Sequence, residues 1–255
     1  VGLLALQAAA FKDVAPYPLD ILGAESEGMI GYLIEQSLAS ALPGREIAAL
    51  LTQVEVDPND AAFSRPTKPI GPVYGEAEAR ALAERSGWTL VPDGRGFRRA
   101  VPSPSPRRIR EINVIRLLIR ANVIVICAGG GGVPVVATAT GGLRGVEAVI
   151  DKDLSASLLA ELIGADALLL LTDVPAVWTR WPKSEGEPIG PTSVEQLRRM
   201  SFAPGSMGPK VDAACRFVER TGRIAAIGAM AQAEQILNGA AGTIVYPPSA
   251  PFSAA

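Results

Sequence analysis

Two lysines stand where helices are expected to begin, a placement suited to binding phosphate. Lys152 lies between two aspartates after an apolar run that predicts a strand, and Asp153 is the expected N-cap of the following helix. Lys210 directly follows Pro209, a residue favoured at the first position of a helix. A cation there opposes the helix macrodipole, and an anionic ligand would offset that cost. Both segments indicate phosphoryl binding, with exposed charges on capped helices as the alternative.

Four consecutive glycines form a second feature that suits an anion. Gly129, Gly130, Gly131 and Gly132 follow the apolar run 123–128, which predicts a strand. Glycine lacks a Cβ, so backbone N–H groups in such a loop can approach a charged ligand closely. We interpret the run as a phosphate cradle, and a slack loop is the alternative. The sequence contains neither the P-loop pattern nor the dinucleotide-binding fingerprint.

Composition excludes several classes of function. The chain contains no histidine, which excludes Ser-His-Asp and Cys-His mechanisms and His-ligated zinc within these 255 residues. The net charge of −2 provides no attraction to nucleic acid or anionic membranes, and glycines with Pro134 would break a membrane helix over the uncharged residues 121–143. Two cysteines, Cys127 and Cys215, do not suggest a disulfide framework, so we expect a cytoplasmic location. Catalysis is expected to rest on Lys, Asp and backbone amides, with or without a metal ion.

Hydrophobic periodicity predicts the elements that position these residues. In the first half we expect a helix at about 20–42, a β run at 47–56, a loop at 57–75, a helix at 76–86, a hairpin from 88–91 and 97–101, and a helix at 109–119. In the second half, helices at 154–163, 194–200, 209–220 and 231–237 alternate with strands at 167–171, 224–227 and 243–246. This alternation predicts an α/β fold with a mainly parallel sheet, whose apolar strands 123–126 and 168–171 are buried on both faces. Six arginines between residues 95 and 110 are either a solvated surface or an anion-binding flap.

The chain resembles the carbamate kinases of the amino acid kinase family along nearly its whole length. The matching segments, in order, are 24–32, 66–72, 128–135, 149–153, 171–174 and 205–210. The resemblance implies an α/β fold, a three-layer αβα sandwich with a mainly parallel central sheet and a small protruding lid subdomain. It also implies two halves: residues 1–148 bind the acid substrate and include the lid at about 57–106, and residues 149–255 bind the nucleotide.

The same resemblance implies a reaction and roles for individual residues. The reaction is reversible phosphoryl transfer between ATP and carbamate, giving carbamoyl phosphate and ADP, with Mg²⁺ and a place in arginine metabolism. Lys152 and Lys210 would neutralise the transferring phosphoryl group, and Asp153 would orient them. Lys68, on the lid, would reach the small substrate. The helix that contains Met29 resembles the family's subunit contact and suggests a homodimer.

The remaining site residues are also assigned by resemblance. The glycines at 129–132 would line the acid-substrate and phosphate side. The residues that would border the nucleotide are Asp173, Trp178, Met207 and Gly208, and Trp178 takes a place that the family often fills with tyrosine. The family's opening strand with its Gly-Gly-Asn loop, and a later His-Gly-Asn-Gly-Pro segment, have no counterpart here. We therefore expect the chain to lack the family's N-terminal segment.

Two other functions remain open at the level of sequence. One is a related kinase of the same fold that acts on another small acid or phosphate, since the glycine run and the lid near Lys68 set the choice of substrate. The other is a non-catalytic module that binds nucleotide. The presence of Lys152, Asp153 and Lys210 argues against the second.

Overall fold

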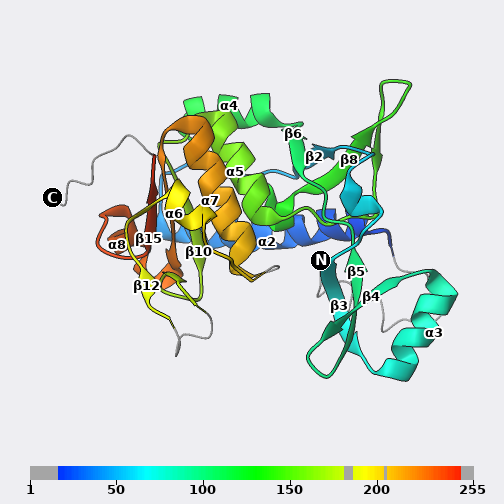
Figure 1. The fold of residues 1–255 in the computed structure, drawn as a ribbon. Coiled ribbons are helices and arrows are strands. Elements are labelled where there is room, and N and C mark those ends of the chain that lie inside the picture. The colour runs from blue at the N-terminus through cyan, green and yellow to red at the C-terminus, as the bar shows by residue number, and fades with distance from the viewer. Residues whose placement is uncertain (1–16, 181–185, 204–205, 248–255) are drawn as a thin grey trace. The chain divides into compact units, whose positions relative to one another are not determined.

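The computed structural model describes residues 17–180, 186–203 and 206–247 (Figure 1). The chain divides into two compact units, residues 1–155 and 156–255, and α5 (Lys152–Ile163) runs from the first unit into the second. Gly205, which belongs to one of the matching segments, lies outside the described residues.

The described part of the first unit opens with a long helix, α2 (Leu19–Ala41), within one residue of the predicted bounds 20–42. Leu22 and Glu27 of α2 are buried. Much of the predicted apolar stripe is exposed instead, and Met29 keeps 41% of its surface accessible. Periodicity therefore predicted the helix correctly but not which of its faces is covered within this chain.

Two sheets of the first unit are built around parallel pairs. In the smaller sheet, β1 (Ile47–Ala49) pairs in parallel with β7 (Ile124–Ile126). The larger sheet has the order β6-β2-β8-β9, and its strands are β6 (Pro106–Ile109), β2 (Gln53–Val56), β8 (Val133–Ala137) and β9 (Leu143–Gly145). Its central pair, β2 and β8, is parallel. Helix α4 (Ile112–Arg120) begins later than predicted because Ile109 pairs with Val54 as part of β6.

The chain changes sheet between β1 and β2. The Leu50 N–H still donates to Ile126 O of β7 at 2.9 Å, whereas the Thr52 N–H donates to the Glu27 carboxylate at 3.1 Å. The prediction of one strand over 47–56 is therefore wrong, because a side-chain acceptor interrupts the ladder. The prediction that the strand at 123–126 is buried on both faces is also wrong, since β7 is half-buried in a two-stranded sheet.

A small subdomain stands apart from the larger sheet of the first unit (Figure 1). It consists of α3 (Glu76–Ser86) and a sheet in the order β3-β5-β4, with β3 (Lys68–Tyr74), β5 (Gly96–Val101) and β4 (Thr89–Asp93). The predicted helix and hairpin are confirmed. The prediction of a loop throughout 57–75 is wrong, because β3 is an edge strand, where Pro69 and Pro72 need not donate to a ladder.

The base of this lid subdomain is anchored to the rest of the first unit. An apolar cluster crosses the junction and consists of Leu19, Leu22, Ile70, Val101 and Val149. Two ion pairs cross it as well, Arg99 with Glu147 at 2.9 Å and Lys68 with Asp151 at 3.1 Å. The lid strands that face the junction are therefore held by both packing and charge.

Four of the six arginines between residues 95 and 110 pair with carboxylates. These pairs are Arg98 with Asp93, Arg99 with Glu147, Arg107 with Asp57, and Arg110 with Glu55. Partnered surface arginines favour the solvated-surface interpretation over an anion-binding flap.

The second unit is a four-stranded sheet in the order β10-β14-β15-β13 with helices between its strands. The strands are β10 (Ala167–Thr172), β14 (Ile224–Ala229), β15 (Thr243–Tyr246) and β13 (Thr192–Ser193). The pairs β10–β14 and β13–β15 are parallel, and β14–β15 is antiparallel. The predicted α/β fold is confirmed, although burial alternates along β10 rather than covering both of its faces.

The helices of the second unit match the predicted segments closely. They are α6 (Val194–Arg198), α7 (Met207–Thr221) and α8 (Ala233–Leu237). Helix α7 buries a continuous face, which includes Val211, Ala214, Phe217 and Val218. Arg198 of α6 donates to Asp212 at 2.7 Å and to Glu219 at 3.1 Å on α7, so the two helices are tied together.

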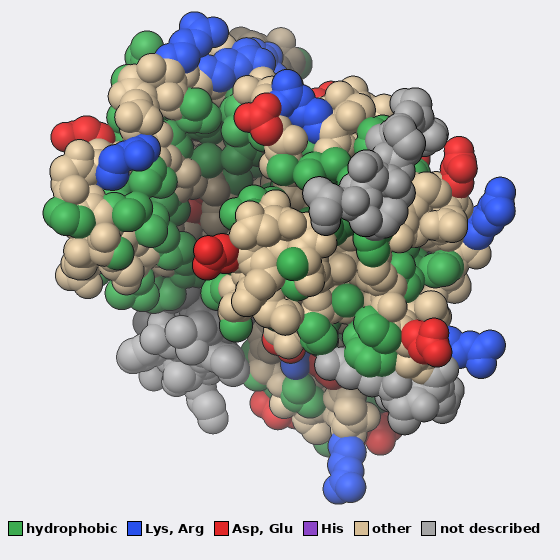
Figure 2. Space-filling view, turned by 90° about the vertical axis from the view of Figure 1, so that its left-hand side faces the viewer, with side chains coloured by type: hydrophobic (Ala, Val, Ile, Leu, Met, Phe, Trp, Pro, Cys, Tyr) green, Lys and Arg blue, Asp and Glu red, His purple; other side chains and the backbone are tan. Residues whose placement is uncertain are grey.

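The surface carries charges of both signs. On the face drawn in Figure 2, basic and acidic side chains are interspersed and hydrophobic side chains reach the surface between them, as the net charge of −2 leads one to expect. Among the helices that the structure describes, none combines the length and the apolar character needed to cross a bilayer.

Candidate functional site

The glycine loop after β7 adopts backbone conformations that require glycine. The φ angles of Gly131 and Gly132 are +109° and +84°. A Cβ on Gly131 would lie 2.4 Å from Ile150 O, and one on Gly132 would lie 2.4 Å from a methyl group of Val54. The loop is therefore closely packed at its C-terminal end, which contradicts the alternative of a slack loop.

Most amides of the glycine loop already have acceptors. Ala128 N–H donates to Thr52 Oγ1 at 2.9 Å, Gly131 N–H to Ala128 O at 3.0 Å, and Gly132 N–H to Gly129 O at 3.1 Å. Within the described residues, the Gly130 N–H has no acceptor, and a Cβ at this exposed glycine would meet nothing within 4 Å. The capacity of the loop to bind an anion is therefore concentrated at its Gly130 tip.

A buried carboxylate holds the N-terminal end of the same loop. Glu27 of α2 is 5% exposed, and its two oxygens accept from Gly129 N–H at 3.0 Å and Thr52 N–H at 3.1 Å. Burial raises the pKa of Glu27 above its ordinary value of 4.5, more than the hydrogen bonds from Thr52 and Gly129 lower it, and the charge of Glu111 adds to the rise. Glu27 was not singled out from the sequence, because a glutamate within a helical pattern gives no sign of burial.

This raised pKa makes a prediction about stability. An acid whose pKa is raised on folding releases its proton at lower pH in the unfolded chain, so the native state loses stability as pH increases from about 4.5 through the raised value. The free energy of unfolding of the wild type, relative to Glu27→Gln, should therefore fall over this range and then level off. Urea denaturation at a series of pH values measures the difference. A difference that is constant with pH, or that rises, would contradict this role of burial.

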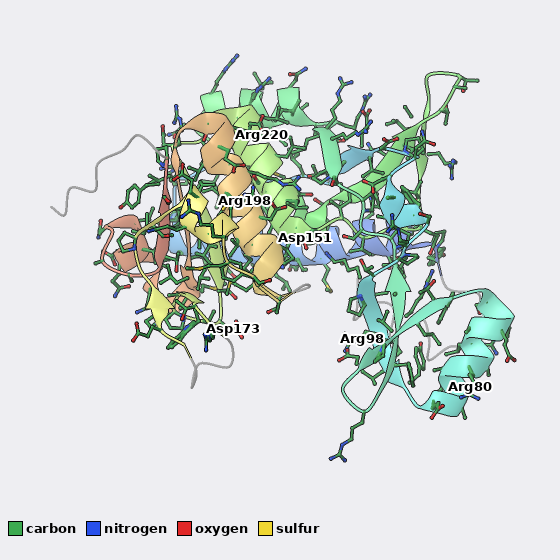
Figure 3. The ribbon with its side chains drawn as sticks, in the orientation of Figure 1. Arg80, Arg98, Asp151, Asp173, Arg198 and Arg220 are labelled. Atoms are coloured by element: carbon green, nitrogen blue, oxygen red, sulfur yellow. The ribbon has the colours of Figure 1, made fainter. Side chains whose placement is uncertain are left out.

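The first turn of α5 is capped by Asp151 rather than by the predicted Asp153. Asp151 Oδ1 accepts from Asp153 N–H at 2.9 Å and from Leu154 N–H at 3.4 Å (Figure 3). The helix begins at Lys152, so Asp153 lies in its first turn instead of preceding it. The predicted cap was wrong by two residues, because Asp151 Oδ1 accepts from both amides of the first turn. The strand predicted from the apolar run before it is also wrong, since residues 146–151 form no regular secondary structure.

The first unit brings four of the predicted site features together at the start of α5. Lys68 of β3 donates to Asp151 Oδ2 at 3.1 Å. Lys152, whose side chain is 64% exposed, pairs with the buried Asp153 at 3.8 Å. The glycine loop joins them, because Ser155 Oγ donates to Gly131 O at 2.7 Å. Cations and amide donors placed together in this way can stabilise the negative charge of a phosphoryl group.

The second unit places Asp173, Met207 and Gly208, three of the four residues predicted to border the nucleotide, near the carboxyl ends of the parallel strands β10 and β14. Asp173 lies just beyond β10, and its carboxylate accepts from Thr172 Oγ1 at 3.1 Å (Figure 3). Helix α7 leads directly into β14, which is parallel to β10, and packs on it, so Met207, Gly208 and the buried Lys210 lie near the ends of both strands. Ligands of α/β sheets bind beyond these carboxyl ends.

Trp178 lies in a separate hairpin of the second unit. The hairpin consists of β11 (Val177–Trp178) and β12 (Pro188–Ile189). Thr243 of β15 is fully buried and secures it, since Thr243 Oγ1 accepts from Val177 N–H at 2.9 Å and donates to Ile189 O at 2.5 Å. One threonine therefore fixes both strands of the hairpin that contains Trp178 to the central sheet.

Neither cysteine is suited to act as a nucleophile. Burial raises the pKa of Cys127, beside the glycine loop, to about 11, and it raises the pKa of Cys215 to about 11 as well, so neither is a ready thiolate nucleophile. Among residues 17–180, 186–203 and 206–247, no three Asp, Glu or Cys side chains are grouped so as to hold a metal ion.

Comparisons with known proteins show the family to which the chain belongs. The model of the amino acid kinase family matches residues 12–228. The carbamate kinase of Haemophilus influenzae is 52% identical over 244 residues, covering 95% of this chain and 79% of that protein, and the carbamate kinase of Thermococcus kodakarensis is 45% identical over 257 residues, covering 96% and 81%. The structure of carbamate kinase from Giardia lamblia bound to AMP-PNP has a TM-score of 0.86 at 39% identity, covering 96% of this chain and 81% of that one. The chain belongs to the amino acid kinase family.

Proposed function

We propose that this protein is a carbamate kinase, which transfers a phosphoryl group reversibly between ATP and carbamate to give carbamoyl phosphate and ADP. The observation that carries the proposal is the cluster in the first unit, where Lys68, Lys152, Asp153 and the glycine loop lie around the start of α5. The 52% identity to the carbamate kinase of Haemophilus influenzae supports carbamate as the acceptor.

The roles proposed for the first unit come from the family resemblance, and the charges and contacts of the residues support them. Residues 1–148 would bind the acid substrate, with residues 57–106 as the lid. Lys152 would neutralise the phosphoryl group, and Asp153, 3.8 Å from its ammonium, would orient it. Lys68 would reach the small substrate from β3, and the glycines at 129–132 would line the phosphate side, with the open amide of Gly130 as the donor.

Residues 149–255 would bind the nucleotide in the proposed division of the chain. Asp173, Trp178, Met207 and Gly208 would border ATP or ADP, supported by their positions on the second unit's sheet edge and hairpin. A Cβ on Gly208 would lie 3.0 Å from Ala203 O, so this turn requires a small residue. Lys210 would supply a second cation to the phosphoryl group.

Mg²⁺ is proposed to be bound with the nucleotide. Mg²⁺ in kinases is held largely by substrate phosphates together with one or two carboxylates, and we assign no residue of this chain as its ligand. When bound, the ion neutralises the charge that develops on the phosphates during transfer.

A homodimer is proposed to form through the exposed apolar face of α2. The exposed side chains of this face are Met29, Ile30, Tyr32, Leu33 and Ile34, with accessible fractions from 41% to 59%. An apolar face of this kind on one helix is typical of a subunit contact. We also propose a cytoplasmic location and a role in arginine metabolism, supported by the free thiols of Cys127 and Cys215 and by the family resemblance.

The experiment that tests this function compares acyl phosphates as donors. The protein, expressed from its own initiator codon, is supplied with ADP, Mg²⁺ and either carbamoyl phosphate or acetyl phosphate, and ATP formation is followed with luciferase. We expect rapid ATP formation from carbamoyl phosphate and at least tenfold less from acetyl phosphate, because a site that hydrogen-bonds a substrate N–H can reject an analogue without it by up to about 10⁴–10⁵-fold. Turnover of acetyl phosphate alone would instead identify a related kinase. Binding of ADP without turnover of either donor would identify a nucleotide-binding module.

A further inference from the structure

We infer that Asp151 is a positioning residue for phosphoryl transfer, because its one carboxylate holds both the lid lysine Lys68 and the first turn of α5. This inference rests on the proposed function, in which Lys68 contacts the small substrate and α5 carries Lys152 and Asp153. No role was assigned to Asp151 from the sequence or from the family resemblance.

The two oxygens of Asp151 make different contacts. Oδ2 accepts from the Lys68 ammonium at 3.1 Å, and that ammonium also lies 3.5 Å from Ile150 O. Oδ1 accepts from Asp153 N–H at 2.9 Å and Leu154 N–H at 3.4 Å, which caps α5. The same side chain thus connects β3 of the lid subdomain to the helix that begins with Lys152.

Partial burial strengthens the ion pair between Lys68 and Asp151. The side chains of Lys68 and Asp151 are 28% and 18% exposed, so water screens their attraction less than it screens a fully exposed pair. Burial raises the pKa of Asp151, but the charge and hydrogen bond of Lys68 and the amides of Asp153 and Leu154 outweigh burial and lower it. Asp151 is therefore ionised at neutral pH and remains an acceptor for both partners.

The ion pair with Asp151 restricts the conformations of the Lys68 side chain. Its four-carbon stem is flexible, so an unpaired ammonium on an edge strand would sample many positions. Pairing with Asp151 restricts Lys68 to the neighbourhood of the Ile150 carbonyl, against which the glycine loop packs through Gly131. The carboxylate therefore places the lid cation beside the loop and the helix start before substrate arrives, which reduces the cost of ordering it on binding.

A second ion pair across the same junction provides a matched control. Arg99 of β5 donates to Glu147 Oε2 at 2.9 Å, and Glu147 Oε1 accepts from Leu19 N–H at 2.8 Å. This carboxylate also has one oxygen on a lid cation and one on a helix amide, but neither partner is a proposed site residue. Comparing Glu147→Gln with Asp151→Asn separates general anchoring of the lid from the specific placement of Lys68.

The test uses Asp151→Asn, because asparagine caps a helix about as well as aspartate but cannot form the ion pair. We expect the KM for carbamoyl phosphate to rise about tenfold, which corresponds to a loss of about 1.4 kcal/mol in binding, while the KM for ADP and kcat stay within about twofold of the wild type. Glu147→Gln should keep wild-type kinetics. Asp151→Ala, which also removes the cap, should lower kcat as well. In a Lys68→Met background, Asp151→Asn should change nothing further.

Several results would overturn the inference. A wild-type KM for carbamoyl phosphate in Asp151→Asn would do so, and so would a tenfold loss that persists in the Lys68→Met background. Equal losses in Glu147→Gln and Asp151→Asn would reduce the role to lid anchoring. If the wild type itself formed no ATP, the proposed function would fail instead, and circular dichroism of each variant checks that the fold is intact.

Discussion

Replacing Lys210 by alanine should lower the rate of ATP formation from carbamoyl phosphate and ADP by about 10²–10³-fold, the usual effect of removing one preorganised donor to a developing charge. Lys210 is 9% exposed and lies in the first turns of α7, where the helix dipole alone would disfavour a cation. In the proposed function, the phosphoryl group would offset that cost. The loss should appear in kcat, measured by initial rates with both substrates saturating.

The control for this variant lies on the same helix. Arg216 pairs with Asp212 at 2.9 Å on the surface of α7, and Arg216→Ala should keep kcat close to that of the wild type. Thermal unfolding of both variants shows whether α7 remains folded. A Lys210→Ala variant that is folded and retains near-normal kcat would remove Lys210 from the mechanism.

Replacing Gly131 by alanine should destabilise the first unit and abolish most activity, whereas Gly130→Ala should destabilise it less. Gly131 has a φ of +109° and its Cβ would lie 2.4 Å from Ile150 O, so the chain before α5 must shift to admit a methyl group. The backbone strain alone costs about 1–3 kcal/mol. Gly130 has a φ of +67° with open space around its Cβ, and alanine there should cost roughly 1–2 kcal/mol.

For the Gly131→Ala variant, the loss of activity should accompany the loss of stability. Displacement of Ile150 by Gly131→Ala would move Asp151 and Lys152, so we expect kcat to fall together with the free energy of unfolding. Urea denaturation and initial rates measured on the same preparations test this coupling. If Gly131→Ala were as stable and as active as Gly130→Ala, the close packing of the loop would not matter for function.

Local sequence patterns predicted most elements because helices and strands leave clear periodic signals. The bounds of α2, α3 and β10 agree with prediction within one residue. The failures have physical causes that no local pattern contains. The run at 47–56 divides because Glu27, distant in sequence, takes the Thr52 amide, and β3 forms within a proline-rich segment because it needs only one neighbour.

The candidate site could be predicted in part for the same reasons. Lysines at helix starts and a glycine run are visible in sequence, and the structure brings Lys68, Lys152 and the glycine loop together within the first unit. The buried polar residues that hold them are not visible, since burial depends on distant contacts. Glu27 and Thr243 belong to this class, and Asp151 was visible as a charge but not as the cap of α5.

The central claim is direct transfer of the phosphoryl group between carbamoyl phosphate and ADP, and ³¹P nuclear magnetic resonance tests it most directly. The protein, expressed from its own initiator codon, is mixed with carbamoyl phosphate, ADP and Mg²⁺, and all phosphorus signals are followed together. We predict that the carbamoyl phosphate signal falls while the γ-phosphoryl signal of ATP rises in equal amount, faster than any change without protein. Loss of carbamoyl phosphate to inorganic phosphate without ATP, or no change beyond the protein-free rate, would contradict the account.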